Sequence, residues 1–326
     1  MSTSEFDIIR QYFTRARAGR ADVVLGIGDD AALLTVPPGA ELVVGIDTLV
    51  AGVHFSTATA AAAIGHKALA VNLSDLAAMG AEPAWATLAL TLPEYDPVWL
   101  EQFADAFFAL ADRYAVQLVG GDTTQGPLTV TVQAHGFVSR GQAVCRRGAL
   151  PGDRVYVTGT LGDAGLALQL GESAPASLQR RLDYPEPRIE AGLLMRKHAS
   201  AAIDISDGLL ADLGHLLAAD ALGAVVQVDA LPRSADFVTA MQQSGAAQEA
   251  RFHDLALSAG DDYELCITVP EPHCAALEAS LGALSCGCTC IGSIEAAPGI
   301  VCYRDGGARY QPASTGYRHF SGAGHD

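Results

Sequence analysis

Aspartate residues embedded in apolar segments are the feature that most constrains this sequence. Counting one of the adjacent pair Asp29 and Asp30, six carboxylates occur at expected strand ends or in glycine-broken turns, with almost no basic residue beside them. The other five are Asp47, Asp75, Asp122, Asp204 and Asp207. A carboxylate packed against apolar strands is costly unless it is paired or bound to a cation. Because too few Lys and Arg lie nearby to pair all six, divalent metal is the economical explanation, and hard oxygen ligands of this kind suit Mg²⁺.

The overall charge excludes two classes of partner. The chain has 326 residues, with 37 acidic against 20 basic residues and a formal net charge of −17. Nucleic acids and anionic membrane surfaces both require basic footprints, so neither is an expected partner. An acidic protein also repels phosphate ligands, and bound metal ions would remove that conflict.

The sequence lacks signals for targeting and for membrane insertion. Its first 20 residues have charges spread through them and no apolar core of signal-peptide length. No stretch approaches the roughly 18 uncharged apolar residues of a membrane span. The seven cysteines are odd in number, and Cys286, Cys288 and Cys290 alternate as in a strand rather than follow zinc spacing. Reduced thiols in the cytoplasm are therefore expected, and the motifs GxxxxGK(S/T), GxGxxG and HExxH do not occur.

Strand and helix signals alternate through the first half of the chain. The segments that predict strands are 31–36, 41–50, 84–92, 115–121 and 128–138. Helices are predicted over 59–79 and 97–115, the latter opened by Asp96-Pro97 as helices often are. The segment 128–138 alternates with period two, which predicts an antiparallel strand with one wetter face.

A turn at Pro151-Gly152-Asp153 separates the two halves, so we expect domains at 1–147 and 148–326. The second half begins with a strand, loop and helix over 155–170. Further helices are predicted over 187–199, 208–219 and 272–281, and strands over 201–206, 224–229, 264–269 and 288–294. The predicted fold is therefore two α/β domains of similar size, with mixed rather than purely parallel sheets.

Glycines stand directly before acids in two segments of the first half. In GIGDDAALL, Gly26 and Gly28 permit a left-handed backbone and close approach to a ligand, although this segment alone is better explained as a hairpin turn. In QLVGGDTT, Gly120 and Gly121 end the predicted strand and precede Asp122. Paired glycines there would expose backbone N–H groups to a phosphate, and a tight turn between strands explains them equally well.

The predicted helix over 59–79 has a selected polar edge. Its apolar stripe contains Leu69, Leu73 and Leu76, while Asn72 and Asp75 share a neighbouring face. The rest of the helix has few charges, which favours a functional edge over an idle solvated flank.

The segment AAIDISDGLLADL places Asp204 at a predicted strand end and Ser206 or Asp207 at the N-cap of the next helix. Serine and aspartate are favoured helix caps, so capping alone accounts for those two residues. A helix N-terminus is also a ready phosphate site, and capping does not explain Asp204.

Several other residues have ordinary explanations when they are taken singly. His54 fits a half-buried histidine, and the pair Arg146 and Arg147 fits an exposed loop. The acids of LSAGDDYEL, which are Asp261, Asp262 and Glu264, fit a turn after a glycine and before a strand. The repeated layout is more informative, because five separate segments combine glycine, a small residue and an acid at an apolar strand or helix edge.

Taken in order, these segments closely resemble the thiamine-monophosphate kinase family. That family belongs to a superfamily with aminoimidazole-ribonucleotide synthetase and selenophosphate synthetase. The matching motifs cover nearly the whole chain: GIGDDAALL, DTLVAGVHF, KALAVNLSDLAAMGAEPAW, GGDTT, HGFV, PGDRVYVTGTLGDAGL, DISDGL, GDDYEL and the terminal GYRHF. The segment NLSDLAAMGA, the segment GIDTLVAGVHF and the ending are the most particular to the kinase.

The resemblance implies ATP-dependent phosphorylation of thiamine monophosphate to the diphosphate, with several Mg²⁺ ions and ATP as co-substrate. It also implies a homodimer in which strands of the N-terminal ATP- and Mg²⁺-binding domain pair across the interface. The implied Mg²⁺ ligands are Asp30, Gly45, Ile46, Asp47, Asp75, Asp122, Asp204 and Asp207. The implied ATP contacts are Gly121, Asp122, Arg146 and Ser206, and the implied substrate contacts are His54, Asp261 and Tyr317, the last by stacking on a thiamine ring.

Two positions depart from the family pattern. Gly45 and Ile46 stand where the family often has Ser-Thr, so their metal contacts would come from backbone carbonyl groups. Asp261 stands where the family has Glu, which shortens the side chain by one methylene, a distance that a water molecule bridges.

The implied chemistry needs no catalytic general base. A phosphate monoester has a second pKa of about 6, so its oxygen is already largely an anionic nucleophile near neutral pH. Bringing two polyanions together is the difficulty, and carboxylate-held Mg²⁺ would relieve it. Two alternatives stay open at this point: another ATP-dependent member of the superfamily with a different phosphorylated or amide substrate, and a non-catalytic nucleotide-binding regulator.

Overall fold

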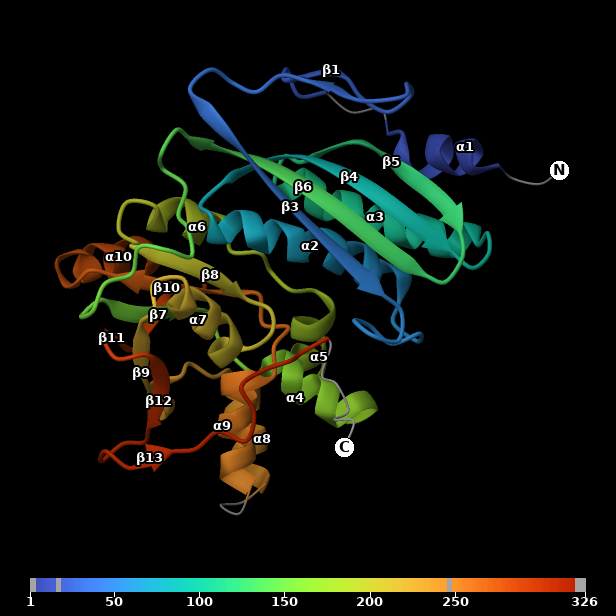
Figure 1. Ribbon diagram of the computed structural model, residues 1–326. Coiled ribbons are helices and arrows are strands. Elements are labelled where there is room, and N and C mark those ends of the chain that lie inside the picture. Colours follow the sequence, from blue (N-terminus) through green and yellow to red (C-terminus); the bar gives the residue numbers. More distant parts are fainter. Residues whose placement is uncertain (1–3, 16–18, 245–247, 320–326) are drawn as a thin grey trace, which may run out of the picture. The chain divides into compact units, whose positions relative to one another are not determined.

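The computed structural model describes residues 4–15, 19–244 and 248–319 (Figure 1). The chain divides into two compact units: Met1–Leu76 with Ala81–Ala143, and Ala77–Gly80 with Val144–Asp326. The units thus separate four residues before the boundary expected from the sequence, and the second unit also takes the end of one helix. The assignment of ATP binding, Mg²⁺ binding and dimerisation to the first domain stays a prediction.

The first unit is built around one four-stranded sheet and two long helices. Its elements in chain order are α1 (Glu5–Ile8), β1 (Val23–Leu25), β2 (Leu33–Leu34), β3 (Ala40–Val50), α2 (Ala61–Ala78), β4 (Glu82–Leu92), α3 (Pro97–Arg113), β5 (Gln117–Gln125) and β6 (Thr129–Ser139). The strand order is β3-β6-β4-β5, with β4 and β5 parallel and the other pairs antiparallel. Helices α2 and α3 cover one face of this sheet (Figure 1).

Strand β6 has the alternation that its sequence predicts. Val130, Val132 and Ala134 are buried, whereas Thr131 and Gln133 between them are half-buried on the other face. Side chains of one strand alternate between the two faces of a sheet, so the apolar set packs inward. The prediction of an antiparallel strand with one wetter face is confirmed.

Helix α3 begins where the sequence predicts. The side chain of Asp96 accepts hydrogen bonds from the N–H groups of Val98 and Trp99, and Pro97 occupies the first turn. These contacts satisfy backbone donors that no helical carbonyl reaches. The helix then buries Phe103 and Phe107, which fixes its inward face.

The second unit contains a larger mixed sheet. Its elements are β7 (Arg154–Thr158), α4 (Asp163–Leu170), α5 (Ala176–Asp183), α6 (Ile189–Met195), β8 (Ala201–Ile205), α7 (Leu209–Ala218), β9 (Gly223–Gln227), α8 (Ala235–Ser244), α9 (Glu249–Ser258), β10 (Glu264–Val269), α10 (Cys274–Leu281), β11 (Cys288–Glu295), β12 (Gly299–Tyr303) and β13 (Arg309–Tyr310). The strand order is β13-β12-β9-β11-β7-β10-β8, in which only β12 and β9 are parallel neighbours. The expectation of two α/β units with mixed sheets is confirmed.

Two apolar clusters hold the second unit together. The larger one packs α7 against the sheet and includes Leu213, Ile203 and Val226. The smaller one joins α4, α5, α8 and α9 through residues that include Leu178 and Phe237. Helices α4, α5, α8 and α9 therefore form a separate layer next to the loop that follows β7. Among the described residues, no helix is long and apolar enough to span a membrane.

Several elements have no counterpart in the sequence prediction. These are α1, α5, α8, α9, β1, β12 and β13. Helix α5 is predominantly polar, and only Leu178 of its residues is buried, so its apolar signal is weak. Strand β13 has only two residues, too few to show any period.

Candidate active site

Two carboxyl groups meet on the covered side of the first unit's sheet. Asp47 lies on β3 and Asp75 lies on α2, and their side chains are within hydrogen-bonding reach of each other. Gly45 makes room for this approach, because a Cβ atom there would lie 3.2 Å from Oδ2 of Asp75. The structure therefore gives Gly45 a steric role beside Asp75, and metal binding by its carbonyl stays a prediction.

Asn72 ties the helix to the strand at this point. Its Oδ1 accepts a hydrogen bond of 3.1 Å from the backbone N–H of Asp47. Its Nδ2 donates to the carbonyl of Ala68 at 3.0 Å, which fixes the orientation of the buried amide. The polar edge that the sequence predicted for this helix thus has two roles: Asn72 positions the backbone of Asp47, and Asp75 supplies a carboxylate.

The protonation of the pair reflects its surroundings. Burial raises the pKa of Asp47, and a hydrogen bond with Asp75 opposes that rise only in part. Two carboxyl groups so close together disfavour a second negative charge, which a cation would stabilise. Because carboxylate oxygens are the ligands that Mg²⁺ prefers, this donor set fits the ion.

Three other predicted residues of the first unit have their own local surroundings. Asp30 is exposed in the loop between β1 and β2, where its N–H bonds to Oδ1 of Asp29 at 2.8 Å. Ile46 is 61% exposed on the open face of β3. His54 follows β3, and its Nδ1 accepts the N–H of Val50 at 2.9 Å, which holds the ring against the end of the strand.

Asp122 is inside a strand and not beyond its end, which corrects the sequence expectation. Strand β5 continues through Gly120 and Gly121 to Gln125. Gly121 has φ +150°, and a Cβ atom there would lie 1.8 Å from the carbonyl oxygen of Leu88, so only glycine fits. The register between β4 and β5 shifts just before this point. The glycine pair is a strand irregularity and not a turn between strands.

Asp122 and Asp47 stand at opposite edges of the sheet. Two strands, β6 and β4, lie between β3 and β5. Three strand spacings of about 4.8 Å separate the edge strands, or roughly 14 Å. The first unit by itself therefore does not bring Asp122 to the carboxyl pair.

The second unit gathers its predicted residues at the end of β8. Asp204 is buried near the end of this strand, and Ser206 and Asp207 follow it directly. Oδ2 of Asp212 accepts hydrogen bonds from the backbone N–H groups of Ser206 and Asp207, both at 3.0 Å, and from Gly208 at 3.1 Å. A single carboxylate from inside helix α7 thus organises the whole turn.

The predicted N-cap at Ser206 or Asp207 is wrong. Helix α7 begins at Leu209, and its N-cap Gly208 makes no side-chain cap. Burial, followed by the charges of Asp204 and Asp207, raises the pKa of Asp212 to about 7. Sequence reasoning missed Asp212 as a distinct site residue, although an acid among leucines in LLADLGHLL was its signal.

Asp261 lies in an irregular loop that lines the same strand end. Its N–H donates to the carbonyl of Ser206 at 2.8 Å, and its Oδ1 accepts the hydroxyl of Tyr263 at 3.1 Å. Asp261 and Tyr263 have φ values of +59° and +50°, which are uncommon for residues other than glycine. Strained backbone of this kind concentrates at functional sites.

The last described segment of the chain returns to this strand end. The N–H of Tyr317 donates to the carbonyl of Asp207 at 2.9 Å, and its side chain is 47% exposed. Arg146 is exposed on the segment beside β8, where the carbonyl of Cys145 accepts the N–H of Ala202. The second unit thus brings Asp204, Ser206, Asp207 and Asp261 together with the backbone of Tyr317.

Within residues 4–15, 19–244 and 248–319, no group of three or more His, Cys, Asp or Glu side chains is arranged to hold a metal ion. The predicted metal ligands come from both units, and each unit has its own cluster. Their roles in binding metal, ATP and substrate stay predictions.

Known proteins resemble this chain along almost its full length. Family models match at residues 28–138, described as AIR synthase related protein, N-terminal domain, and at 150–305, the C-terminal domain of the same family. The thiamine-monophosphate kinase of Salmonella typhimurium is 51% identical over 98% of this chain and 99% of its own length.

Solved structures give the same picture. The crystal structure of thiamine-monophosphate kinase from Stenotrophomonas maltophilia K279a is 48% identical, with a TM-score of 0.81 over 89% of this chain and 93% of that one. AaThiL complexed with AMPPCP and TMP is 32% identical, with a TM-score of 0.76 over 90% of this chain and 92% of that one.

Proposed function

This chain belongs to the thiamine-monophosphate kinase family, and we propose that it transfers the γ-phosphoryl group of ATP to thiamine monophosphate, giving thiamine diphosphate and ADP. The observation that carries the proposal is 51% identity to a kinase of this name over 98% of the chain. The relative solved with AMPPCP, an ATP analogue, and TMP supports both substrates. Of the site residues expected from the sequence, Asp47 and Asp75 contact each other in the first unit, and Asp204, Ser206, Asp207 and Asp261 lie at one strand end in the second.

The reaction asks the protein mainly to position two phosphate groups. Because a phosphate monoester is already largely dianionic near neutral pH, no side chain has to remove a proton. We assign no general base, and the role of the chain is to hold its acids and backbone donors in fixed positions. Asn72 and Gly45 do this for the Asp47 and Asp75 pair.

The proposed Mg²⁺ ligands are Asp30, Gly45, Ile46, Asp47, Asp75, Asp122, Asp204 and Asp207. Mg²⁺ bound there would neutralise phosphate charge and orient an in-line displacement. The raised pKa of Asp47 supports this assignment, because a buried acid pair gains stability from a cation.

The proposed ATP contacts are Gly121, Asp122, Arg146 and Ser206. Arg146 is exposed and supplies the positive charge that a triphosphate needs. The N–H of Ser206 is already bonded to Asp212, so its hydroxyl group is the available contact. His54, Asp261 and Tyr317 are the proposed substrate contacts, and the exposed ring of Tyr317 suits stacking on a heterocycle.

We also propose that two copies of the chain associate through the first unit. Leu42, Val44 and Ile46 alternate along β3 and are 42%, 48% and 61% exposed, which places three large apolar side chains on one open face. Strand β3 is also an edge of its sheet, with unpaired backbone groups. Localisation in the cytoplasm stays a prediction from the charge and cysteine content.

The decisive experiment is a coupled assay of ADP release with thiamine monophosphate as acceptor. We expect ADP release that requires thiamine monophosphate and Mg²⁺, and stops when EDTA is added. Reactions without acceptor, and with other phosphorylated or amide acceptors, are the controls. Absence of acceptor-dependent ADP release, or equal release with an unrelated acceptor, would contradict the proposal.

A further inference from the structure

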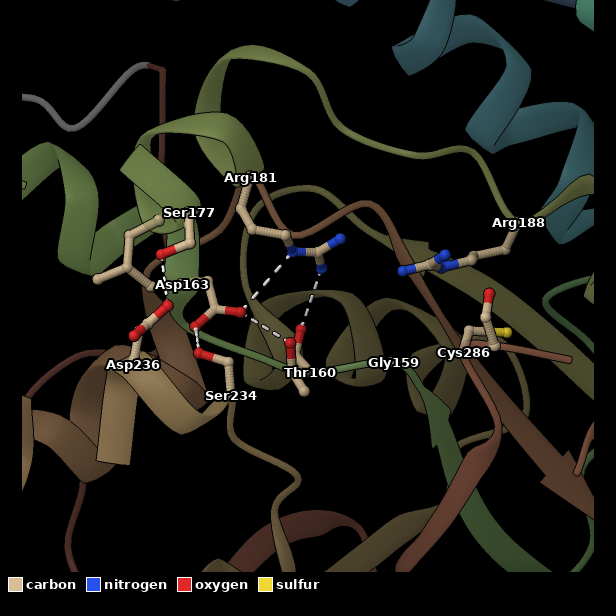
Figure 2. A pocket seen from close by; sticks show the side chains of 11 residues that line it. Gly159, Thr160, Asp163, Ser177, Arg181, Arg188, Ser234, Asp236 and Cys286 are labelled. Carbon is tan, nitrogen blue, oxygen red and sulfur yellow. Dashed lines mark hydrogen bonds and ion pairs between the residues drawn. The ribbon is translucent and has the colours of Figure 1, made fainter. Parts of the chain in front are cut away.

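A cavity of about 370 Å³ lies in the second unit, between the loop after β7 and helix α5. Its lining contains Arg181 of α5 and Arg188, which precedes α6, together with Cys286 from the loop before β11. Figure 2 shows the two guanidinium groups facing each other across this cavity. None of the residues proposed above for metal, ATP or substrate lines it.

Both arginines contact one buried carboxylate. Glu264 is fully buried, and its two oxygens accept Arg188 Nε at 2.6 Å, Arg188 Nη2 at 2.5 Å and Arg181 Nη2 at 2.7 Å. The hydroxyl of Thr158 donates to the same carboxylate at 2.7 Å. Arg188 alone, in its two-pronged geometry, already supplies the one positive charge that a buried carboxylate needs. The second guanidinium is in excess of that requirement.

The remaining carboxylates of the lining do not use up this excess as hydrogen-bond acceptors. Asp163 forms an ion pair with Arg181 whose Nε to Oδ2 distance of 3.7 Å is too long for a hydrogen bond, and its oxygens accept the hydroxyls of Thr160 at 2.7 Å and Ser234 at 2.6 Å. Asp236 accepts the hydroxyl of Ser177. In Figure 2 these five hydroxyl and carboxylate groups lie on the side of the cavity away from Arg188.

Unused donors therefore remain on the guanidinium groups. Nε of Arg181 is buried and has no hydrogen-bond partner. In the described part of the chain, Nη1 of Arg181 and Nη1 of Arg188 also make no hydrogen bond. A buried donor is normally satisfied, so Nε of Arg181 marks a place for an acceptor, and the two Nη1 groups are further donors on the same two side chains.

We propose that this cavity binds a small oxyanion, a phosphate or a carboxylate, between the guanidinium groups of Arg181 and Arg188. Planar guanidinium groups match the oxygens of both classes in two-pronged geometry. The hydroxyl and carboxylate side of the cavity would receive hydrogen-bond donors on the rest of the ligand. The site is separate from the proposed phosphoryl-transfer site and does not depend on that assignment.

The test is equilibrium dialysis of the full-length protein against inorganic phosphate, and separately against malonate, in buffer with EDTA. Without Mg²⁺ the acid-rich proposed active site repels anions, so binding there is suppressed. We expect saturable binding of at least one of the two anions. Absence of saturable binding of both would overturn the proposal.

Matched variants locate the bound anion. Arg181→Gln removes a guanidinium, and Ser285→Trp fills the cavity from the exposed loop before β11 while both arginines are kept. Each should weaken binding at least about tenfold, the size expected for loss of a charge-assisted contact. Retained affinity in either variant would overturn the proposal, and Ser285→Trp keeps the test valid if Arg181→Gln folds poorly.

Two controls separate a specific site from a general charge effect. Arg180→Gln makes the same charge change next to Arg181, where the exposed side chain lies over the ring of Tyr184. Arg146→Gln changes a proposed ATP contact. Both should bind as the wild type does, and loss of binding in either would overturn the assignment to the cavity.

Discussion

Asp47 and Glu264 are both carboxylates withdrawn from water, but their surroundings move their pKa values in opposite directions. Burial raises the pKa of Asp47, and the hydrogen bond with its acidic neighbour Asp75 opposes that rise only in part. Burial also acts to raise the pKa of Glu264, yet the hydrogen bonds of Arg188 and the charges of Arg188 and Arg181 outweigh it and lower the pKa. The neighbour of Asp47 is another acid, whereas Glu264 contacts two positively charged guanidinium groups.

This difference separates two uses of a buried acid. Glu264 joins β10 to α5 and to the segment before α6, so it contributes to the fold. The Asp47 and Asp75 pair costs stability in the absence of a cation, so its retention is better explained by ligand binding. Substitutions at the two places should therefore change different properties.

The largest expected effect on stability is at Glu264. Glu264→Gln leaves two guanidinium groups around an uncharged amide and should lower the free energy of unfolding by about 3–5 kcal/mol, the usual result of breaking a buried ion pair. Urea denaturation followed by circular dichroism measures this loss. The matched control is Glu271→Gln, because that side chain is 77% exposed and 4.0 Å from Arg154. If Glu264→Gln lowers the free energy of unfolding no more than the control does, the contacts of Glu264 with Arg181 and Arg188 do not stabilise the fold.

The largest expected effect on turnover is at Asp75. Asp75→Asn removes one charge from the acid pair and should reduce the Mg²⁺-dependent kinase rate by about 100-fold, or about 2.7 kcal/mol. Stability should stay equal or rise, because like-charge repulsion is relieved. The ADP-release assay with urea denaturation separates the two outcomes, and Asp105→Asn on the exposed face of α3 is the control. A near-wild-type rate would remove Asp75 from the proposed metal ligands.

A smaller change is expected at Gly45. A methyl group there would stand 3.2 Å from Oδ2 of Asp75, so Gly45→Ala should displace the carboxylate by a few tenths of an ångström. Such a shift should reduce the rate by about 3- to 10-fold and weaken the apparent affinity for Mg²⁺. Gly19→Ala, where the added Cβ has only an ordinary contact of 3.8 Å with Gln117, is the comparison. Equal rates for the two variants would mean that the spacing at Gly45 does not matter.

The smallest expected change is in the pH dependence of stability. The folded-state pKa of Glu264 is lowered, so its contribution is fully present above the ordinary carboxyl pKa of about 4.3 and is lost as pH falls through the folded value. The stability difference between wild type and Glu264→Gln should be constant from pH 7 to about 5 and narrow below about 4. Urea denaturation at a series of pH values measures it. A difference that already narrows above pH 5 would contradict the sign of the shift.

Predictions from the sequence were most accurate for elements whose pattern depends on neighbouring residues and extends over many positions. The period-two alternation of β6 and the Asp96-Pro97 start of α3 both reflect neighbours within a few residues, and both are present in the structure. The polar edge of α2 was readable for the same reason, because Asn72 and Asp75 lie one helical turn apart.

The misses share a different physical cause. The extent of β5 depends on the carbonyl of Leu88 in the neighbouring strand, which no local pattern around Gly121 reveals. The start of α7 depends on Asp212 reaching back to three backbone N–H groups, which a capping rule based on the preceding residues does not contain. The cavity between Arg181 and Arg188 requires a partner in β10, about 80 positions later in the sequence. Contacts between distant segments decided the first and the third of these features, and a residue downstream of the cap, inside the helix, decided the second.

The hydrogen bond from Tyr317 to the carbonyl of Asp207 has a practical consequence. It means that a residue near the carboxyl end of the polypeptide, beyond the last strand, is fastened to the turn after β8. Proteolytic cleavage between β13 and Tyr317 would leave the seven-stranded sheet whole and would remove a proposed substrate contact. A preparation shortened in this way would look well folded in a spectrometer and still be a poor enzyme, so mass spectrometry of the intact chain should accompany any measurement of specific activity.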